Sequence, residues 1–115
     1  MSARSIYRIV TEEELRTAEE SGRVPRNSAD EASGFVHLSP HTEVLTTASR
    51  YYSSYPKLYV LEVSAEALGP DLKWEVVKSR NNVSFPHLYA PNIPWESVKE
   101  VHTLFINAQG VFDWS

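Results

Sequence analysis

Gly-Phe-Val-His-Leu-Ser at residues 34–39 and Phe-Pro-His-Leu-Tyr-Ala-Pro at residues 85–91 are the two stretches that decide the fold. Each places one histidine inside an otherwise apolar run, which is typical of a β-strand. Side chains along a strand point alternately to its two faces. His37 therefore lies on the face opposite to Val36 and Leu38.

The same alternation sorts the polar side chains of both stretches. Phe35, His37 and Ser39 share one face of the first strand, and His87 and Tyr89 share one face of the second. If the two strands are neighbours, two imidazoles, a hydroxyl and a phenol converge. The sequence predicts a two-histidine cleft at this place.

Length and composition limit the classes of protein to which this chain can belong. A chain of 115 residues is predicted to form a single domain over residues 1–115. It contains no cysteine, which excludes disulfides and thiolate metal sites. The net charge of -4, from 11 basic and 15 acidic residues, argues against an extended nucleic-acid surface but leaves room for a small anion site. No apolar run is long enough to span a membrane and no signal region is visible, so we expect a cytoplasmic protein without a membrane partner. We also expect a monomer.

Helix signals are strongest near the N-terminus. A strand at 6–10 is followed by a helix at 12–21, where Thr11 and Glu14 have the spacing of a capping box. Residues 23–33 are rich in turn formers and are predicted to be a loop. A second helix is expected to begin with Ser39 as its N-cap, before Pro40, and to end before residue 53.

The remainder alternates short strands with turns. Strands are predicted at 58–63, 72–77, 101–106 and 111–114, with the second histidine stretch among them and single helical turns at 65–68 and 95–99. The pattern predicts an α+β fold, in which two N-terminal helices pack on a bent or split, mostly antiparallel β-sheet.

His37 and His87 are the candidate catalytic residues, because imidazole titrates near neutral pH. The alternative for His37 is a half-buried histidine that donates to a backbone carbonyl. Tyr89 follows His87 by two residues between two prolines, which is unusual for a plain core strand, and is a candidate substrate-binding residue.

Ser39, Glu75 and Arg80 complete the candidate substrate-binding residues. Ser39 and the free amides after it suit an anion, although its capping role alone explains a serine there. Arg80 is suited to hold a phosphate or carboxylate, unless it is simply a solvated loop residue. Glu75 is either the acid of the site or a solvent-facing strand residue. Glu75, His37 and His87 would make a metal-ligand set, but no tight ligand spacing is present and we expect no metal. Glycine-rich nucleotide loops and nucleophile motifs are also absent.

Four motifs in order carry a resemblance to a known family. The chain has Ile-Tyr-Arg-Ile at 6–9, the histidine stretch at 34–39, Leu-Lys-Trp-Glu at 72–75 and Phe-Pro-His-Leu-Tyr at 85–89. Together they resemble the family catalogued as domain of unknown function 952, over nearly the whole chain. This family is similar in fold to the ADP-ribosyltransferase-like domains, which include tRNA 2′-phosphotransferase. The resemblance implies a split β-sheet whose cleft binds NAD or an NAD-like nucleotide.

The resemblance also implies roles by position. His37 would touch the nicotinamide ribose, and His87 or Tyr89 would hold or stack on the nicotinamide ring. The third-motif catalytic glutamate of the ribosylating toxins has no match after residue 91, which argues against protein ADP-ribosylation.

Two hypotheses follow. The first is a transferase or degenerate transferase acting on NAD or another nucleotide or phosphorylated substrate, with no certain cofactor and phosphate held by Arg80 or the amides after Ser39. The alternative is a non-catalytic module that binds a small ligand or a protein.

Overall fold

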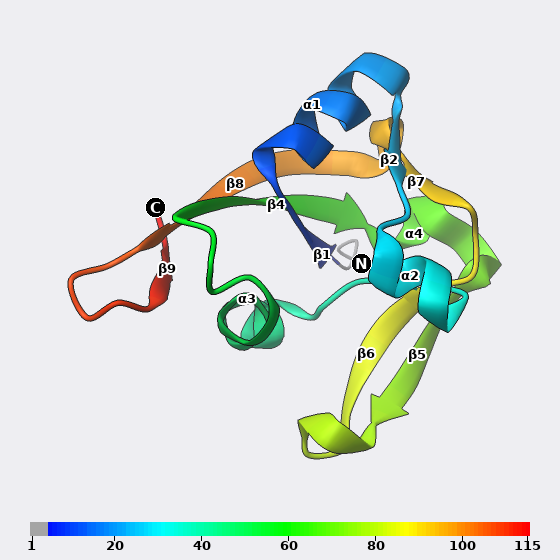
Figure 1. Cartoon of the computed structure of the whole chain (residues 1–115). Helices are drawn as coiled ribbons and strands as arrows, with labels where there is room; N and C mark the ends of the chain where they lie inside the picture. Colours follow the sequence, from blue (N-terminus) through cyan, green and yellow to red (C-terminus); the bar gives the residue numbers. More distant parts are fainter. Residues whose placement is uncertain (1–4) are drawn as a thin grey trace.

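The computed structural model describes residues 5–115 and has a mixed α/β fold built around a curled antiparallel sheet (Figure 1). The strands are β1 Ser5–Val10, β2 Arg23–Pro25, β3 Val36–His37, β4 Lys57–Ser64, β5 Leu72–Val77, β6 Val83–Leu88, β7 Asn92–Pro94, β8 Val98–Ile106 and β9 Phe112–Trp114. The helices are α1 Glu12–Ser21, α2 Ser28–Ser33, α3 Val44–Tyr51 and α4 Ala65–Leu68, with 3-10 turns η1 His41–Glu43, η2 Gly69–Asp71, η3 Lys78–Arg80 and η4 Trp95–Ser97.

The sheet is split, as the sequence predicted, and every strand pair in residues 5–115 is antiparallel. Four strands follow the order β1-β4-β8-β9, three follow β3-β6-β5, and β2 pairs with β7. The four-stranded and three-stranded parts meet at one bridge, where Tyr7 and Ser39 exchange both backbone hydrogen bonds, of 2.9 and 2.8 Å. This bridge fixes the first histidine strand beside β1.

Both faces of β4 are buried, which explains why its sequence is an almost continuous apolar run. Leu58 and Val60 pack with α3 on one face, whereas Leu61 and Val63 pack with α1, β3 and β6 on the other. Val36 and Leu38, which the alternation set on one face, both join the second of these clusters. None of the helices in residues 5–115 has the length and apolar character needed to cross a membrane.

The predicted loop at 23–33 is wrong, because this segment contains β2 and α2. Asn27 caps α2 by accepting from the Asp30 N–H at 2.9 Å, and the Asp30 carboxylate accepts from the Asn27 N–H at 2.8 Å. Gly34 ends the helix with a φ of 85°, in the left-handed region that favours glycine. Two of the turn formers in this segment, Asn27 and Asp30, therefore form a helix cap.

The predicted capping role of Ser39 is also wrong. Its backbone N–H and carbonyl are both used in the bridge to Tyr7, and Pro40 precedes a 3-10 turn with no side-chain cap. The α-helix α3 begins only at Val44, with Glu43 at its N-cap position, so Ser39 does not cap an α-helix. By contrast, α1 and its capping box between Thr11 and Glu14 are confirmed.

Candidate functional site

The two histidine strands are neighbours. β3 pairs with β6 in a register that sets His37 opposite His87 and Val36 opposite Leu88. The two imidazole rings lie 5.9 Å apart between centroids and meet edge to face. The strand pairing thus brings the two histidines of the sequence pattern to one place.

His37 is held by a buried carboxylate. Its Nδ1 lies 2.7 Å from Oδ1 of Asp30, and because a carboxylate only accepts, Nδ1 is the donor. Asp30 is fully buried and also pairs with Arg8, whose Nη2 donates to Oδ2 at 2.7 Å. Burial alone would raise the pKa of the Asp30 carboxyl, but the hydrogen bonds from His37 and Arg8 outweigh it and hold that pKa well below its ordinary value.

His87 has a carboxylate partner of its own. Its Nδ1 donates to Oε1 of Glu75 at 2.7 Å, and the Tyr89 hydroxyl donates to the same oxygen at 2.7 Å. These two hydrogen bonds, the one from Tyr89 and then the one from His87, lower the pKa of the Glu75 carboxyl. His87 is buried, with 10% of its side chain exposed, while Glu75 is 40% exposed.

The two pairs share one geometry. In each, Nδ1 faces a carboxylate and Nε2 has no hydrogen-bond partner among residues 5–115, so Nε2 is the nitrogen available to a ligand. The Phe35 ring lies between them, 4.6 Å from the His37 ring and 4.0 Å from the His87 ring. Phe35 thereby fixes both imidazole planes by packing.

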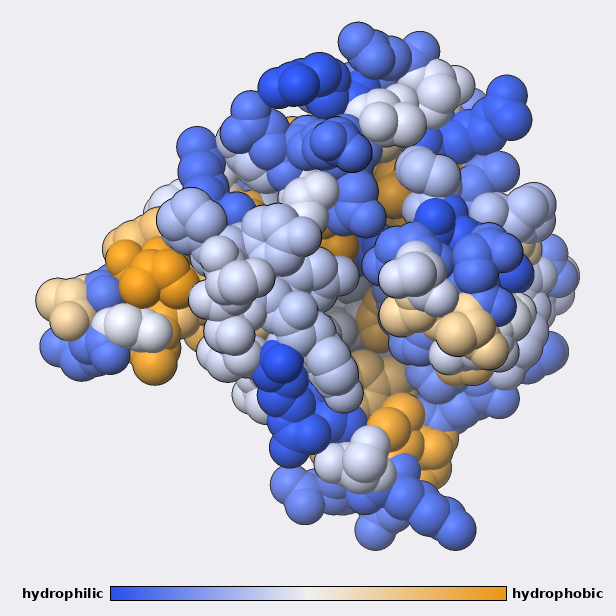
Figure 2. Space-filling view, viewed as in Figure 1, coloured by the Kyte–Doolittle hydropathy of each residue, from blue (hydrophilic) through white to orange (hydrophobic). Residues whose placement is uncertain are grey.

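A pocket of about 640 Å³ opens in front of both imidazoles. Figure 2 shows this face hollowed between the side chains over α3 and those over α2. The volume is within the range of small-molecule sites. The walls are strongly aromatic and carry Tyr7, Phe35, Tyr51, Tyr52, Tyr55 and Phe85. The hydroxyl-bearing residues Thr11, Ser28, Ser39, Thr47 and Ser79 also line it.

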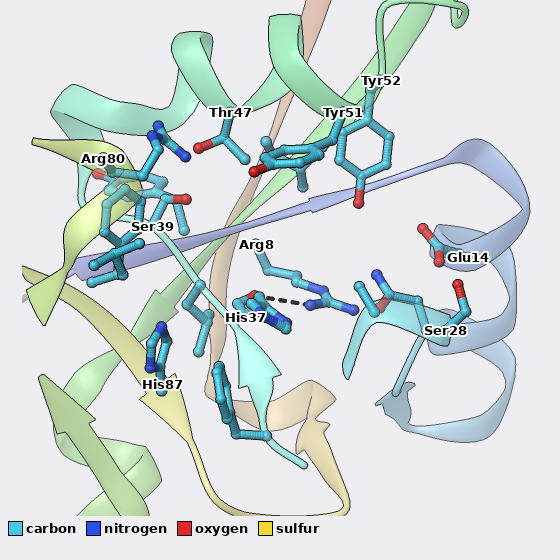
Figure 3. Close-up of a pocket in the computed structure, with 18 of the residues that line it drawn as sticks. Arg8, Glu14, Ser28, His37, Ser39, Thr47, Tyr51, Tyr52, Arg80 and His87 are labelled. Atoms are coloured by element: carbon cyan, nitrogen blue, oxygen red, sulfur yellow. Dashed lines mark hydrogen bonds between the residues drawn. The ribbon is translucent and has the colours of Figure 1, made fainter. Parts of the chain in front are cut away.

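Arg80 lines the pocket as a buried residue, not as a solvated loop side chain. Its Nη2 donates to Oε1 of Glu43 at 2.9 Å, and its guanidinium lies 4.7 Å from the Phe85 ring centroid. Figure 3 shows Arg80, Ser39 and Thr47 gathered at one end of the pocket, with Glu14 and Ser28 at the other. The pocket therefore has a cationic end.

Two buried polar atoms in the described chain have no hydrogen-bond partner, and both belong to residues that line this pocket. They are Nε of Arg8 and Oγ1 of Thr47. A buried polar atom left unpaired costs roughly 1–3 kcal/mol. Their location indicates a pocket shaped for a polar ligand.

The structure brings four of the six predicted site residues to the pocket: His37, Ser39, Arg80 and His87. Glu75 and Tyr89 are not part of the lining and lie behind His87, which they hold. The sequence reasoning did not select Asp30 or Glu43. The capping-box spacing of Asn27 and Asp30 marks α2, but nothing in the sequence indicates that Asp30 also reaches His37.

Another ionisable cluster lies outside the pocket, on β4 and β8. Ligand atoms of Glu62, Glu100 and His102 lie within 4.8 Å of one another. Glu62 is already satisfied there, since His102 Nε2 lies 2.9 Å from Oε1, Ser5 donates to Oε2 at 2.7 Å, and Lys99 Nζ is 3.7 Å away. An ion-pair network accounts for this cluster.

The solved structures to which the chain is similar include two of one protein from Caulobacter crescentus. The crystal structure of protein CC0527 from Caulobacter crescentus, a structural genomics target, is 36% identical, with a TM-score of 0.85 over 95% of this chain and 93% of that one. The solution NMR structure of CC0527 is 36% identical, with a TM-score of 0.79 over 93% and 90%. Comparison with curated proteins gives no match. The model of a family described as protein of unknown function DUF952 matches residues 9–101. The chain therefore belongs to the DUF952 family.

Proposed function

We propose that the pocket binds a nucleotide or another phosphorylated small molecule, and that His37 and His87 act as acid and base in a group transfer from it. The observation that carries the proposal is the pair of His–carboxylate contacts, Asp30–His37 and Glu75–His87, on adjacent strands. Each leaves Nε2 available at the pocket.

The proton balance of the proposed step uses both imidazoles. One neutral Nε2 takes the proton of the attacking hydroxyl or water, while the other, protonated imidazole gives its Nε2 proton to the leaving group. The bond to the nucleophile forms as the bond to the leaving group breaks. The carboxylate behind each ring accepts a hydrogen bond from Nδ1 and so fixes the tautomer and the orientation of the imidazole. Positioned acid–base groups of this kind contribute about 10²–10⁴-fold in rate.

The walls of the pocket suit a nucleotide. The aromatic rings offer faces on which a base can stack, the hydroxyls can pair with a ribose, and the arginine end can take phosphate. An ADP-ribosyltransferase-like arrangement is part of this proposal, with the split sheet supporting it. NAD and ADP-ribose are therefore among the first ligands to test.

A non-catalytic binding module is the second candidate, and one observation favours it. Glu14 is the only acidic residue lining the pocket within residues 5–115, and its carboxylate is engaged with the Thr11 N–H at 2.9 Å. An oxocarbenium-like centre would therefore have no free carboxylate beside it. The same pocket would then retain a ligand without turning it over.

Thermal unfolding with NAD, ADP-ribose and nucleoside mono- and diphosphates tests binding. A ligand at 100 times its Kd stabilises by ~2.7 kcal/mol. In a domain of this size, that raises Tm by on the order of 10 °C. If none of these compounds raises Tm, the nucleotide pocket is rejected.

Measuring turnover of the compounds that bind then distinguishes an enzyme from a non-catalytic binding module. The products of each binding compound are followed by chromatography for the wild type, His37→Gln and His87→Gln. His102→Gln is the matched control, because His102 pairs with Glu62 but lies outside the pocket. We expect the two pocket variants to lose about 10²-fold or more in rate, with the control unchanged. Binding without turnover in the wild type would instead support the module.

A further inference from the structure

We propose that Arg80 and Thr47 form a phosphate-binding site at the cationic end of the pocket. In this proposal the Glu43 carboxylate pairs with Arg80 until the phosphate of a ligand displaces it. The inference rests on the proposed function, because it specifies how the phosphorylated substrate is held. It assigns roles to Thr47 and Glu43 that the acid–base step does not use.

Arg80 is a buried cation with unused donors. A guanidinium has five N–H donors, and the Nη2 contact to Glu43 at 2.9 Å is the single hydrogen bond of this side chain among residues 5–115. The Phe85 ring, 4.7 Å away, covers one face and fixes the plane of the group. Arg80 lines the pocket, and its other N–H groups are not used by Glu43. A planar, fixed fork of this kind binds the oxygens of a phosphate well.

Thr47 supplies a second, independent observation. Its Oγ1 is buried, belongs to a residue that lines the pocket, and has no hydrogen-bond partner in the part of the chain that the structure describes. Figure 3 shows this oxygen directed toward Arg80 from the α3 side. A hydroxyl donates one hydrogen bond, so a phosphate between Thr47 and Arg80 would satisfy both side chains. Without a ligand, the hydroxyl remains unpaired.

Glu43 is suited to be displaced. It lies at the end of η1, and its side chain is 22% exposed, whereas that of Arg80 is 6% exposed. A buried arginine needs an anionic partner, while a partly exposed carboxylate can turn into water at little cost. Exchanging the Glu43 carboxylate for a phosphate keeps the buried guanidinium neutralised. Glu43 is thus an internal competitor that sets the affinity for the ligand's phosphate.

The test measures the binding of inorganic phosphate and pyrophosphate by two-dimensional NMR titration of the folded protein. Glu43→Gln removes the competitor and should tighten binding about tenfold. Thr47→Val, which keeps the shape of the side chain, should weaken it about threefold through the lost donor. Thr46→Val and Lys78→Met are matched controls on the same helix and the same turn, both exposed, and should change binding by less than about twofold.

A gain of affinity cannot come from misfolding, so Glu43→Gln is the decisive variant. Unchanged or weaker binding in Glu43→Gln, or a loss in Lys78→Met equal to that in Arg80→Met, would overturn the proposal. If no variant binds phosphate while the histidine variants still lose turnover, the phosphate-binding site is rejected and the proposed function stands. If phosphate binding follows the prediction but the protein shows no turnover, the phosphate-binding site is supported and the acid–base role is rejected.

Discussion

Asp30→Asn tests the connection between the fold and the pocket. The carboxylate accepts hydrogen bonds from Nη1 and Nη2 of Arg8, from the Asn27 N–H, and from both the N–H and Nδ1 of His37. An asparagine side chain retains one acceptor oxygen, and its NH₂ group faces donors on the other side. It also leaves Arg8, 3% exposed, without its charged partner.

The loss of folding stability in Asp30→Asn follows from the burial of the Arg8–Asp30 ion pair. Breaking a buried ion pair by removing one partner typically destabilises a protein by about 3–5 kcal/mol. With a urea dependence of about 1.5 kcal/mol per molar, a typical value for small proteins, the unfolding midpoint should fall by at least about 2 M. The pH dependence has a definite sign. Because the pKa of Asp30 is lowered by folding, its stabilisation is present above the ordinary carboxyl pKa and is lost as pH falls through the folded value.

Urea unfolding at pH 7 and at pH 3 measures both effects. The difference in stability between wild type and Asp30→Asn should be largest at pH 7 and smaller at pH 3, because pH 3 lies below the ordinary carboxyl pKa and the unfolded wild-type chain already takes up the proton there. Asp71→Asn, at an exposed position, is the control. The double variant with Arg8→Met removes both charges and should recover stability relative to Asp30→Asn. A single variant within about 1 kcal/mol of wild type would refute the reasoning about buried pairs.

Three further predictions concern the cap, the core and the support of His87. Thr11→Ala should cost about 1 kcal/mol by removing the N-cap of α1, and an unchanged urea midpoint would contradict the cap. Leu88→Ala should cost about 3 kcal/mol because the side chain is fully buried beside β3, whereas a loss below about 1 kcal/mol would mean that the pocket wall collapses to fill the space. Tyr89→Phe removes a donor to Glu75 and should raise the pKa of that carboxyl toward its ordinary value, as measured by carboxyl-carbon NMR titration.

The parts of the fold that the sequence predicted are those with complete local signals. The helix α1 has its capping box, its acidic first turn and a glycine stop, and β4 is an apolar run long enough to be unambiguous. α2 has only six residues, too few to show helical periodicity, so its caps were interpreted as turns. Ser39-Pro40 has the composition of a helix start, but a tertiary bridge to Tyr7 uses the backbone of Ser39 instead.

The candidate site also combines residues that local sequence signals predict with residues that only tertiary contacts bring in. Strand alternation predicted that His37 and His87 face away from their apolar neighbours, and their convergence needed only the pairing of two strands. Glu75, the partner of His87, was among the candidates in the sequence. Asp30 and Glu43 are harder to find, because Asp30 reaches His37 from a helix and Glu43 reaches Arg80 from a turn far from it in sequence. Contacts of this kind depend on tertiary packing, which has no local signature.

The two carboxylates behind the histidines are not equivalent, and this difference decides which variant can report on function. Asp30 caps α2, neutralises Arg8 and holds His37, so any change to it alters stability and the pocket together. Glu75 is 40% exposed, and within residues 5–115 its side chain forms hydrogen bonds only with the His87 ring and the Tyr89 hydroxyl. Glu75→Gln therefore changes the partner of His87 without leaving a charge buried. Loss of turnover in Glu75→Gln with an unchanged urea midpoint would assign Glu75 to the positioning of His87, because a purely structural carboxylate would lose stability first.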